Sequence, residues 1–468
     1  MLFTDILFLF YFFPLFIFLY LLTHKNNTIS NLVIVIFSLI FYASFGFNNL
    51  TILVIPLILD FFIAIGIYKF RGTTIAKMLL GIAIAGNLGL LAYFKYYTFI
   101  LDNIGIENFS PNDITTLNSL KPILIPLGIS FITFQRISYI VDVYRNKITP
   151  TTNFLKYATY ASLFPHLVSG PIVRFSQIKE QLGKRVINSE TIFEGTKYFV
   201  LGFAFKLLIA NQLFTVEDLI VQNITNIQLL ESIILMIFFS FRIYFDFLGY
   251  SFIAIGLAKF IGFDFPQNFN SPYQATSITD FWRRWNITLS SWLKDYLYIP
   301  LGGNRKGKIR TYINLLITML LGGLWHGASW NFIIWGALHG GFLAIERALS
   351  DLKIKIAVPK YFARIFTFMI VTFSWIIFRF SDTQQLDFLL QSLTKIDINA
   401  LNEALILPLI YSLPALIVAV IWSFFLNENI VLKIKPRTRN GWAFTAAFLF
   451  LITYSLLKRG IPFIYFQF

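Results

Sequence analysis

The sequence has 468 residues, of which 57% are hydrophobic, 18% aromatic and only 13% charged. This composition excludes an ordinary soluble domain and predicts a polytopic membrane protein. The chain has no cysteine, which excludes disulfides, thiolate catalysis and zinc–thiolate sites. The net charge of +15 comes from Lys and Arg in short loops between apolar runs, which is typical of membrane topology rather than nucleic-acid binding.

Apolar runs long enough to cross a bilayer recur along the chain. A span needs roughly 20 helical residues, and lipid cannot satisfy open backbone groups, so each run is predicted to be helical. Clear examples are Ile6–Leu22, Leu50–Tyr68, Leu229–Phe247 and Trp442–Leu457. The first lacks a basic start and a small-residue cleavage site, which favours a retained span over a signal peptide. We predict an all-α polytopic fold with about 11–12 transmembrane helices, in a single membrane domain over residues 1–468.

Basic loops alternate with acidic, base-poor segments between these runs. The positive-inside rule places the basic loops in the cytoplasm and segments such as Glu217-Asp218 on the opposite side. No stretch between the runs is long enough to form a soluble domain. The basic loops are Lys69–Lys77, Arg145–Lys147, Arg174–Arg185, Arg305–Arg310, Arg347–Arg364 and Lys433–Arg439.

Two stretches, Phe154–Pro171 and Ser251–Pro300, are interrupted by Pro, Gly and polar residues. At membrane depth such backbone is tolerated only where protein or a water-filled cavity surrounds it. We therefore expect re-entrant or interfacial helices that line a central cavity. His166 lies in the first stretch and is a cavity candidate, whereas His24 lies in a loop and is expected to be solvated. Neither histidine has the spacing of a metal ligand.

The segment Ser277–Tyr296 has the pattern of an amphipathic helix. Ser277–Asp280 has the spacing of a capping box, which predicts a helix start just before Trp282. Trp and other apolar residues recur at steps of three or four on one predicted face, and polar residues on another. An interfacial helix anchored at the lipid headgroups explains the Trp and Arg residues but not Asn286. The polar face comprises Arg283, Asn286, Ser290 and Lys294.

His326 follows the apolar run Tyr312–Trp325 and is flanked by glycines. An ionisable residue inside a membrane run is by default a functional candidate, and neutral imidazole is the commonest general base near neutral pH. Trp325 beside it is a secondary cavity candidate. His339 lies on the predicted next span, where it either faces the same cavity or packs structurally.

Two further clusters of polar residues lie within apolar runs. One contains Gln135 and Arg136, and the other contains Arg242 and Asp246. Arg242 and Asp246 are about one helical turn apart, so they can pair on one helix face, and structural pairing is favoured over direct chemistry. Gln135 and Asp246 are kept as secondary cavity candidates.

The polar and aromatic motifs resemble those of the membrane-bound O-acyltransferases, in particular the bacterial branch that acetylates cell-wall and exopolysaccharide hydroxyls. Pro126–Arg145, Gly170–Arg174 and Tyr244–Phe247 look like the first signatures of this family, and Trp282–Gly307 and Leu324–Gly340 complete the match. The resemblance implies a ring of tilted helices around a central tunnel. It also implies a cytoplasmic funnel for the acyl donor and an opening for the acceptor on the far side.

The resemblance also implies the active-site residues. The family's catalytic histidine maps onto His326, and its second active-site position, which is His in many bacterial members and Asn in many eukaryotic ones, maps onto Asn286. An Asn amide cannot act as a base, but it can orient the acceptor or donate a hydrogen bond to an oxyanion. His326 is then the general base of the pair. The basic candidates for binding the phosphates of the donor are Arg283, Lys294, Arg305 and Lys306.

The implied reaction moves an acetyl group from a cytoplasmic donor, acetyl-CoA, across the membrane to a cell-envelope polysaccharide. Peptidoglycan is the preferred acceptor; the alternatives are an alginate-like exopolysaccharide and the D-alanylation of teichoic acid. The resemblance further implies a multi-pass protein in the lipid of the bacterial cytoplasmic (inner) membrane and a separate extracytoplasmic, esterase-like partner. No bound cofactor or metal is expected. A small-molecule transporter is the alternative from another class, which the broken stretches suit but the missing inverted repeat disfavours.

Overall fold

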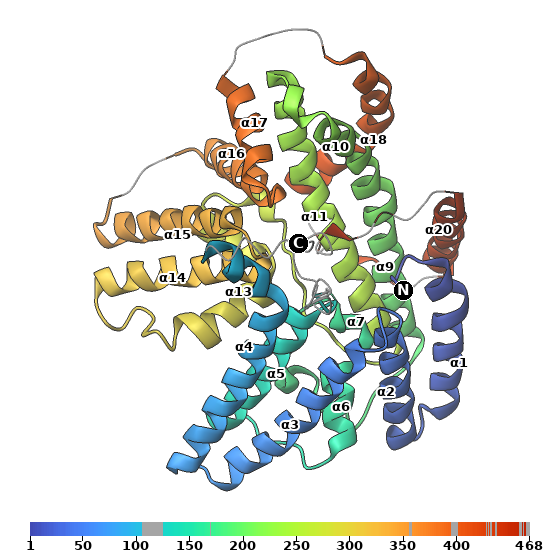
Figure 1. Cartoon of the computed structure of the whole chain (residues 1–468). Helices are drawn as coiled ribbons and strands as arrows, with labels where there is room; N and C mark the ends of the chain where they lie inside the picture. The colour runs from blue at the N-terminus through green and yellow to red at the C-terminus, as the bar shows by residue number, and fades with distance from the viewer. Residues whose placement is uncertain are drawn as a thin grey trace, which may run out of the picture. The chain divides into compact units, whose positions relative to one another are not determined.

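The computed structural model consists of helices and contains no strand over the residues that it describes (Figure 1). This confirms the predicted all-α class. In two of the predicted basic loops, residues 355–357 and 436–437 lie outside the described part of the chain. The described residues are 1–104, 125–168, 170–354, 358–394, 401–426, 428, 430, 433–435, 438–457, 461 and 463–464.

Seven helical segments of the described chain are long and apolar enough to cross a membrane, so the protein is a polytopic membrane protein. Shorter apolar helices cover Phe8–Thr23 and Asn27–Ala43. A total of about 11–12 spans remains a prediction. The seven segments are α3 (Asn49–Lys69), most of α4 (Thr74–Asn103), the continuous run Ser189–Gln222, α11 (Leu229–Phe260), α15 (Trp330–Asp351), α16 (Lys360–Arg379) and α18 (Glu403–Phe425).

The chain divides into two compact units, of which the first comprises Met1–Val186 and Ile261–Phe265. The helix α2 begins after Asn26, whose side chain accepts hydrogen bonds from two backbone N–H groups of the first turn. The helix α5 begins after Gly128, which has a φ of 72° and leaves no room for a Cβ, because that atom would lie 2.1 Å from the Leu167 carbonyl oxygen. The remaining helices of this unit are η1 (Phe8–Phe12), α1 (Phe13–Thr23), α2 (Asn27–Ala43), α5 (Ile129–Tyr144), α6 (Phe154–Ser162), α7 (Phe164–Leu167) and α8 (Phe175–Ile178).

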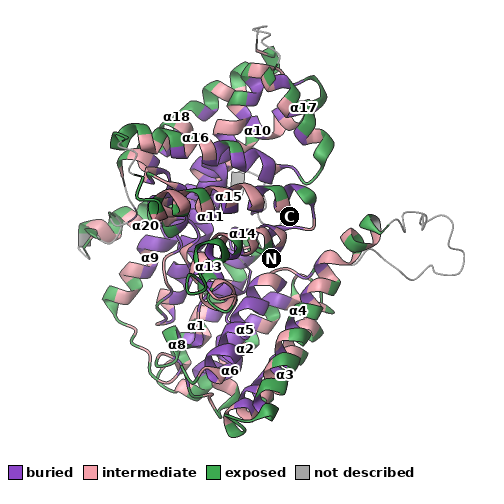
Figure 2. Ribbon diagram, turned by 90° about the vertical axis from the view of Figure 1, so that its left-hand side faces the viewer, coloured by how far each residue is buried: buried purple, intermediate pink, exposed green. Residues whose placement is uncertain are grey.

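The second unit comprises Ile187–Phe260 and Pro266–Phe468. The helix α11 lies in the interior of this unit, since 78% of its most apolar stretch is buried, compared with 28% for the same kind of stretch in α15. Figure 2 shows the buried residues in purple. The helices α14 and α15 lie side by side as a hairpin (Figure 1). The remaining helices are α9 (Ser189–Ala204), η2 (Phe205–Ala210), α10 (Asn211–Gln222), η3 (Ile224–Asn226), η4 (Pro272–Gln274), α12 (Ile278–Arg284), α13 (Ile287–Leu293), η5 (Lys294–Tyr298), α14 (Lys308–His326), α17 (Thr383–Thr394) and α20 (Thr438–Leu457).

One of the two stretches predicted to be broken is partly regular. Residues from Ser251 onward continue α11 as far as Phe260, so the irregular backbone begins later than predicted. Gly256 does not break this helix; it permits close packing against α9, since a Cβ there would lie 2.8 Å from the Gly195 carbonyl oxygen. The other stretch contains the short helices α6 and α7, as its Pro and polar residues indicated. Re-entrant placement and the single membrane domain over residues 1–468 remain predictions.

Buried ion pairs join the helices of the second unit. Glu217, which belongs to an acidic segment predicted to lie on the side opposite the cytoplasm, is fully buried within α10. Its Oε1 lies 2.6 Å from Arg242 Nη1 and 2.6 Å from Arg379 Nε. Asp246 pairs with Lys206 at 2.7 Å. The predicted pairing of Arg242 with Asp246 on one helix face is therefore wrong: each pairs with a residue of another helix, and sequence spacing along α11 does not reveal such partners.

Candidate active site

A pocket of about 1300 Å³ lies in the second unit, among α12, α13, η5, α14 and α15. Glu346 in its wall accepts hydrogen bonds from the backbone N–H groups of Ile278 (2.7 Å) and Thr279 (2.9 Å), at the start of α12. Five cationic side chains outnumber this carboxylate, so the pocket suits an anionic ligand. The cationic residues are Arg283, Lys294, Arg305, Arg347 and Lys353.

Most of the predicted donor-binding residues line this pocket. Arg283, Lys294 and Arg305 do so, together with Ser290, whose hydroxyl donates to the Trp285 carbonyl oxygen at 3.3 Å. Lys306 is not a lining residue; its side chain folds over Gly302, where an added Cβ would lie 3.0 Å from Lys306 Cδ.

The sequence did not single out the other polar wall residues. Arg347 lies in α15 and Lys353 just after it, in a basic stretch that was interpreted only as a sign of topology, although their charge could have marked them. Tyr298 also lines the pocket, and desolvation raises the pKa of its hydroxyl above the ordinary value, while nearby Arg347 lowers it. The structure therefore adds two cationic side chains and one phenol to the predicted lining residues.

The predicted continuous amphipathic helix is broken in the middle. Its start is confirmed, because the Ser277 hydroxyl accepts a hydrogen bond from the Asp280 N–H at 3.1 Å. However, α12 ends at Arg284, and α13 begins only after Asn286, which has φ 41° and ψ 56°. Backbone hydrogen bonds to an irregular segment before α12 fix the break: the Ile287 N–H donates to the Asn268 carbonyl oxygen at 2.9 Å.

Asn286 is therefore separated from the polar face to which the helical pattern assigned it. It is 1% exposed, whereas Arg283 and Lys294 are exposed at the pocket. Neither Oδ1 nor Nδ2 of Asn286 has a hydrogen-bond partner within the described part of the chain. Asn is one of the few residues that tolerate the left-handed backbone conformation. A buried amide without a partner is costly to a fold, which marks Asn286 as a group available to a ligand.

His326 is the last residue of α14 and lies in an aromatic surrounding. Its ring centroid is 4.8 Å from Trp325, 5.3 Å from Trp335 and 5.0 Å from Phe378. His326 is only 6% exposed and Trp325 5%, so the imidazole is shielded from bulk solvent. A neutral imidazole in a dry aromatic surrounding is suited to take a proton from a hydroxyl nucleophile.

Close packing between α14 and α15 positions His326. A Cβ on Gly323 would lie 2.1 Å from the Phe332 carbonyl oxygen, and a Cβ on Gly336 would lie 2.4 Å from the Met319 carbonyl oxygen. The two backbones therefore approach more closely than any side chain would permit. Met319 also lines the pocket, and it precedes His326 by about two helical turns, or about 10 Å along the axis.

His339 belongs to a hydrogen-bonded chain rather than to the pocket wall. It is completely buried; its Nδ1 lies 3.3 Å from Trp282 Nε1 and its Nε2 lies 2.9 Å from Ser374 Oγ. Trp335 packs against both histidines, with centroid distances of 5.3 Å to His326 and 4.8 Å to His339. His339 thus lies next to the aromatic surroundings of the candidate base and does not line the pocket.

The other secondary candidates do not line this pocket. Asp246 accepts a hydrogen bond from the Ile464 N–H at 2.8 Å, in addition to its pair with Lys206. Gln135 and His166 belong to the first unit, where both are fully buried. His166 Nε2 contacts the Tyr160 carbonyl oxygen at 3.1 Å, and both polar atoms of the Gln135 side chain lack a partner within the described chain. Within the described residues, no group of three His, Asp or Glu side chains could hold a metal ion.

Known proteins are similar in sequence to most of this chain. The model of the membrane-bound O-acyltransferase family matches residues 145–381. The chain is 42% identical to a probable alginate O-acetylase of Pseudomonas putida over 390 residues, which are 81% of this chain and 77% of that protein. It is 36% identical to a peptidoglycan O-acetyltransferase of Helicobacter pylori, again over 81% of this chain and 77% of that protein. A teichoic acid D-alanyltransferase of Streptococcus thermophilus is 30% identical over 50% of this chain and 59% of its own length.

Proposed function

Because the chain belongs to the membrane-bound O-acyltransferase family and is therefore an acyltransferase, we propose that it transfers an acetyl group from acetyl-CoA toward a hydroxyl of a cell-envelope polysaccharide. The observation that carries the proposal is the pocket, which is lined by five cationic side chains and by Trp282, and Trp282 contacts Trp335, which in turn packs against His326. Membership of this family weighs against the small-molecule transporter that the sequence left as an alternative.

The pocket fits a nucleotide-bearing thioester in both size and charge. Its volume of about 1300 Å³ exceeds the roughly 300–1,000 Å³ of pockets for drug-sized ligands. Arg305 and Arg347 supply planar guanidinium groups, which bind phosphate oxygens in a bidentate manner. Arg305 lies in a basic loop and Arg347 near the end of α15, and the positive-inside rule puts such basic stretches in the cytoplasm, where acetyl-CoA is made.

His326 acts as the general base. The acceptor hydroxyl oxygen attacks the thioester carbonyl carbon as the imidazole takes the hydroxyl proton. The carbon–sulfur bond then breaks, and the coenzyme A thiolate leaves with the proton that the imidazolium returns to it. Asn286 donates its free amide N–H to the oxyanion that forms on the carbonyl oxygen during this step.

Two acceptors are supported by the relatives. The probable alginate O-acetylase has higher identity than the peptidoglycan O-acetyltransferase over the same share of this chain, which favours an alginate-like exopolysaccharide over the acceptor preferred from the sequence. D-alanylation has less support, because the teichoic acid D-alanyltransferase matches only half of the chain. We place the protein in the bacterial cytoplasmic membrane, where a separate extracytoplasmic esterase-like partner completes the transfer to the polymer.

The first experiment tests the donor and the base. Purified protein in lipid nanodiscs is incubated with acetyl-CoA labelled in the acetyl group, and release of coenzyme A and labelled product is followed. His326→Ala is expected to abolish release, whereas His24→Ala, which removes a histidine in the first unit whose Nδ1 contacts the Leu21 carbonyl oxygen, is expected to leave it unchanged. Equal turnover by the wild type and His326→Ala would exclude His326 as the base.

A second experiment identifies the acceptor. Ester-linked acetate is released with mild base from peptidoglycan and, separately, from secreted exopolysaccharide of cells that express the wild type or His326→Ala. A difference confined to one polymer assigns the acceptor. Absence of a difference in both polymers would contradict polysaccharide O-acetylation.

A further inference from the structure

Trp282 connects the pocket to a buried histidine. Its side chain lines the pocket although the residue is only 9% exposed, so one edge of the indole forms wall surface and the rest is buried. From the buried side, indole Nε1–H donates a hydrogen bond to His339 Nδ1 at 3.3 Å. An indole nitrogen has a single proton and can only donate, which makes His339 Nδ1 the acceptor.

The other ring nitrogen of His339 is also engaged. Ser374 donates its hydroxyl proton to the Val371 carbonyl oxygen at 2.7 Å, so its Oγ is left to accept from His339 Nε2–H at 2.9 Å. Together the two contacts fix the neutral tautomer with the proton on Nε2. Both nitrogens of His339 are then occupied within the protein, and neither is available to take a proton from a substrate.

The Trp335 ring links Trp282 and His339 to the candidate base His326. Trp335 packs edge-on against Trp282 at 5.7 Å, against His339 at 4.8 Å and against His326 at 5.3 Å. A shift of the Trp282 indole would therefore change both the pocket wall and the packing around His326.

We propose that His339 is a positioning residue that holds the Trp282 indole in the pocket wall, so that a bound donor is seated in register with His326. The proposal rests on the function proposed above. His339 takes no part in proton transfer; it acts through the hydrogen bond to Trp282, and Ser374 fixes the tautomer that makes this bond possible.

Two variants remove the bond from opposite ends. Trp282→Phe keeps an aromatic ring but has no N–H, and His339→Gln places its amide at the position of Nε2, where it can donate to Ser374, and has no acceptor at the position of Nδ1. Each is expected to raise KM for acetyl-CoA about 2- to 13-fold, since one hydrogen bond contributes about 0.5–1.5 kcal/mol, with the pH profile of kcat unchanged. The double variant is expected to be no worse than either single one.

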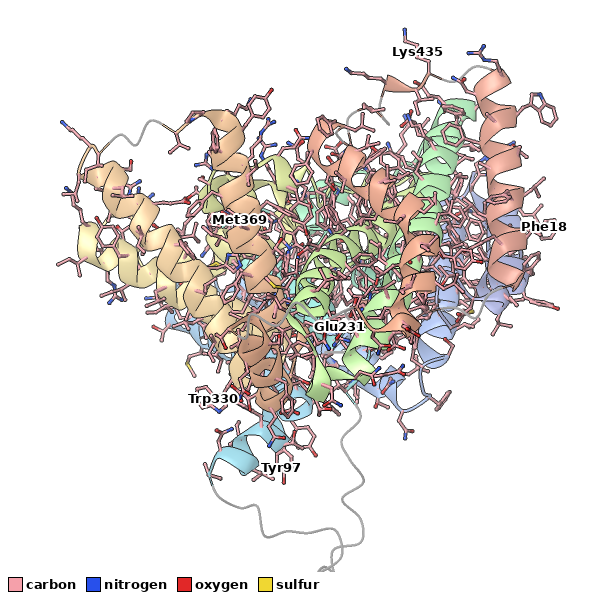
Figure 3. All side chains as sticks on the ribbon, turned by 90° about the horizontal axis from the view of Figure 1, so that it is seen from above. Phe18, Tyr97, Glu231, Trp330, Met369 and Lys435 are labelled. Carbon is pink, nitrogen blue, oxygen red and sulfur yellow. The ribbon has the colours of Figure 1, made fainter. Side chains whose placement is uncertain are left out.

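The matched control is Trp330→Phe, which changes an exposed tryptophan at the start of α15 that is 54% exposed (Figure 3). It is expected to leave KM unchanged. If His339→Gln instead abolishes kcat as His326→Ala does, while Trp282→Phe retains it, His339 is a catalytic group and the proposal is wrong. Additive effects of Trp282→Phe and His339→Gln on KM would also contradict it.

A spectroscopic measurement tests the hydrogen-bonded chain without acetyl transfer. In full-length protein labelled with ¹⁵N-histidine, the resonance lost in His339→Gln is expected to show a protonated Nε2 and an unprotonated Nδ1, and to shift in Trp282→Phe. A protonated Nδ1 would overturn the proposal. Because this readout needs no donor, the chain can be confirmed even if acetyl-CoA proves not to be the substrate.

Discussion

The close contact between α14 and α15 gives a sharp test of how His326 is held. Gly323→Ala would place a Cβ 2.1 Å from the Phe332 carbonyl oxygen, whereas real Cβ contacts are essentially never shorter than 3.0 Å. The obstacle is backbone rather than a flexible side chain, so the helices must separate by about 1 Å at this point. His326 lies one turn further along α14 and moves with it.

The expected loss is mainly in catalysis. A displacement of about 1 Å at a catalytic group costs about 100-fold in rate, and overpacking of this kind costs about 1–3 kcal/mol in stability. We therefore expect kcat for acetyl transfer to fall by about two orders of magnitude, with a lower thermal unfolding temperature in detergent. The assay is release of coenzyme A from acetyl-CoA by protein in nanodiscs.

Gly341→Ala is the matched control, because a Cβ at that position of α15 meets nothing within 4 Å. It is expected to leave kcat unchanged and to stabilise the helix by about 0.5–1 kcal/mol. If Gly323→Ala and Gly341→Ala have the same kcat and the same unfolding temperature, the close helix contact does not set the position of His326, and the reasoning fails.

Three further predictions follow from buried and pocket residues. Glu217→Gln removes the charge shared by two arginines and is expected to lower the free energy of unfolding by about 3–5 kcal/mol, whereas Asp218→Asn next to it should have little effect; equal unfolding temperatures would contradict this. Asn286→Gly keeps the left-handed backbone but removes the amide, so a loss of kcat assigns a role to the amide, and full activity would leave only a backbone role. Arg305→Gln is expected to raise KM for acetyl-CoA most strongly at low salt, and Lys306→Gln, outside the pocket, is expected to leave KM unchanged. A larger increase of KM in Lys306→Gln than in Arg305→Gln would contradict binding of the donor in this pocket.

The long helices could be predicted from the sequence because hydrocarbon imposes a single solution on an apolar run. The predicted span Leu50–Tyr68 corresponds to α3, Asn49–Lys69, within one residue at each end. The helix start at Ser277 was equally predictable, since capping depends only on neighbouring residues. Local rules were sufficient wherever the deciding contacts were local.

The break at Asn286 could not be predicted from the same pattern. The spacing of three and four residues between apolar positions fits one continuous helix. However, backbone hydrogen bonds with residues 268–270 end α12, and a new helix, α13, begins after Asn286. The partners of Glu217 were hidden for the same reason, because they come from α11 and from the end of α16. The role of His339 depended on Trp282 and Ser374, which no sequence spacing brings together.

The ion pair between Lys206 and Asp246 has a consequence for biogenesis. Asp246 also accepts a hydrogen bond from the N–H of Ile464, which is synthesised 218 residues later. At ordinary rates of translation this is a delay of about 10–40 s. During that interval Asp246 would enter the bilayer as a costly charge if it were alone. Lys206 is made earlier and lies on the neighbouring segment η2, so it can neutralise the aspartate as the nascent helices emerge from the ribosome.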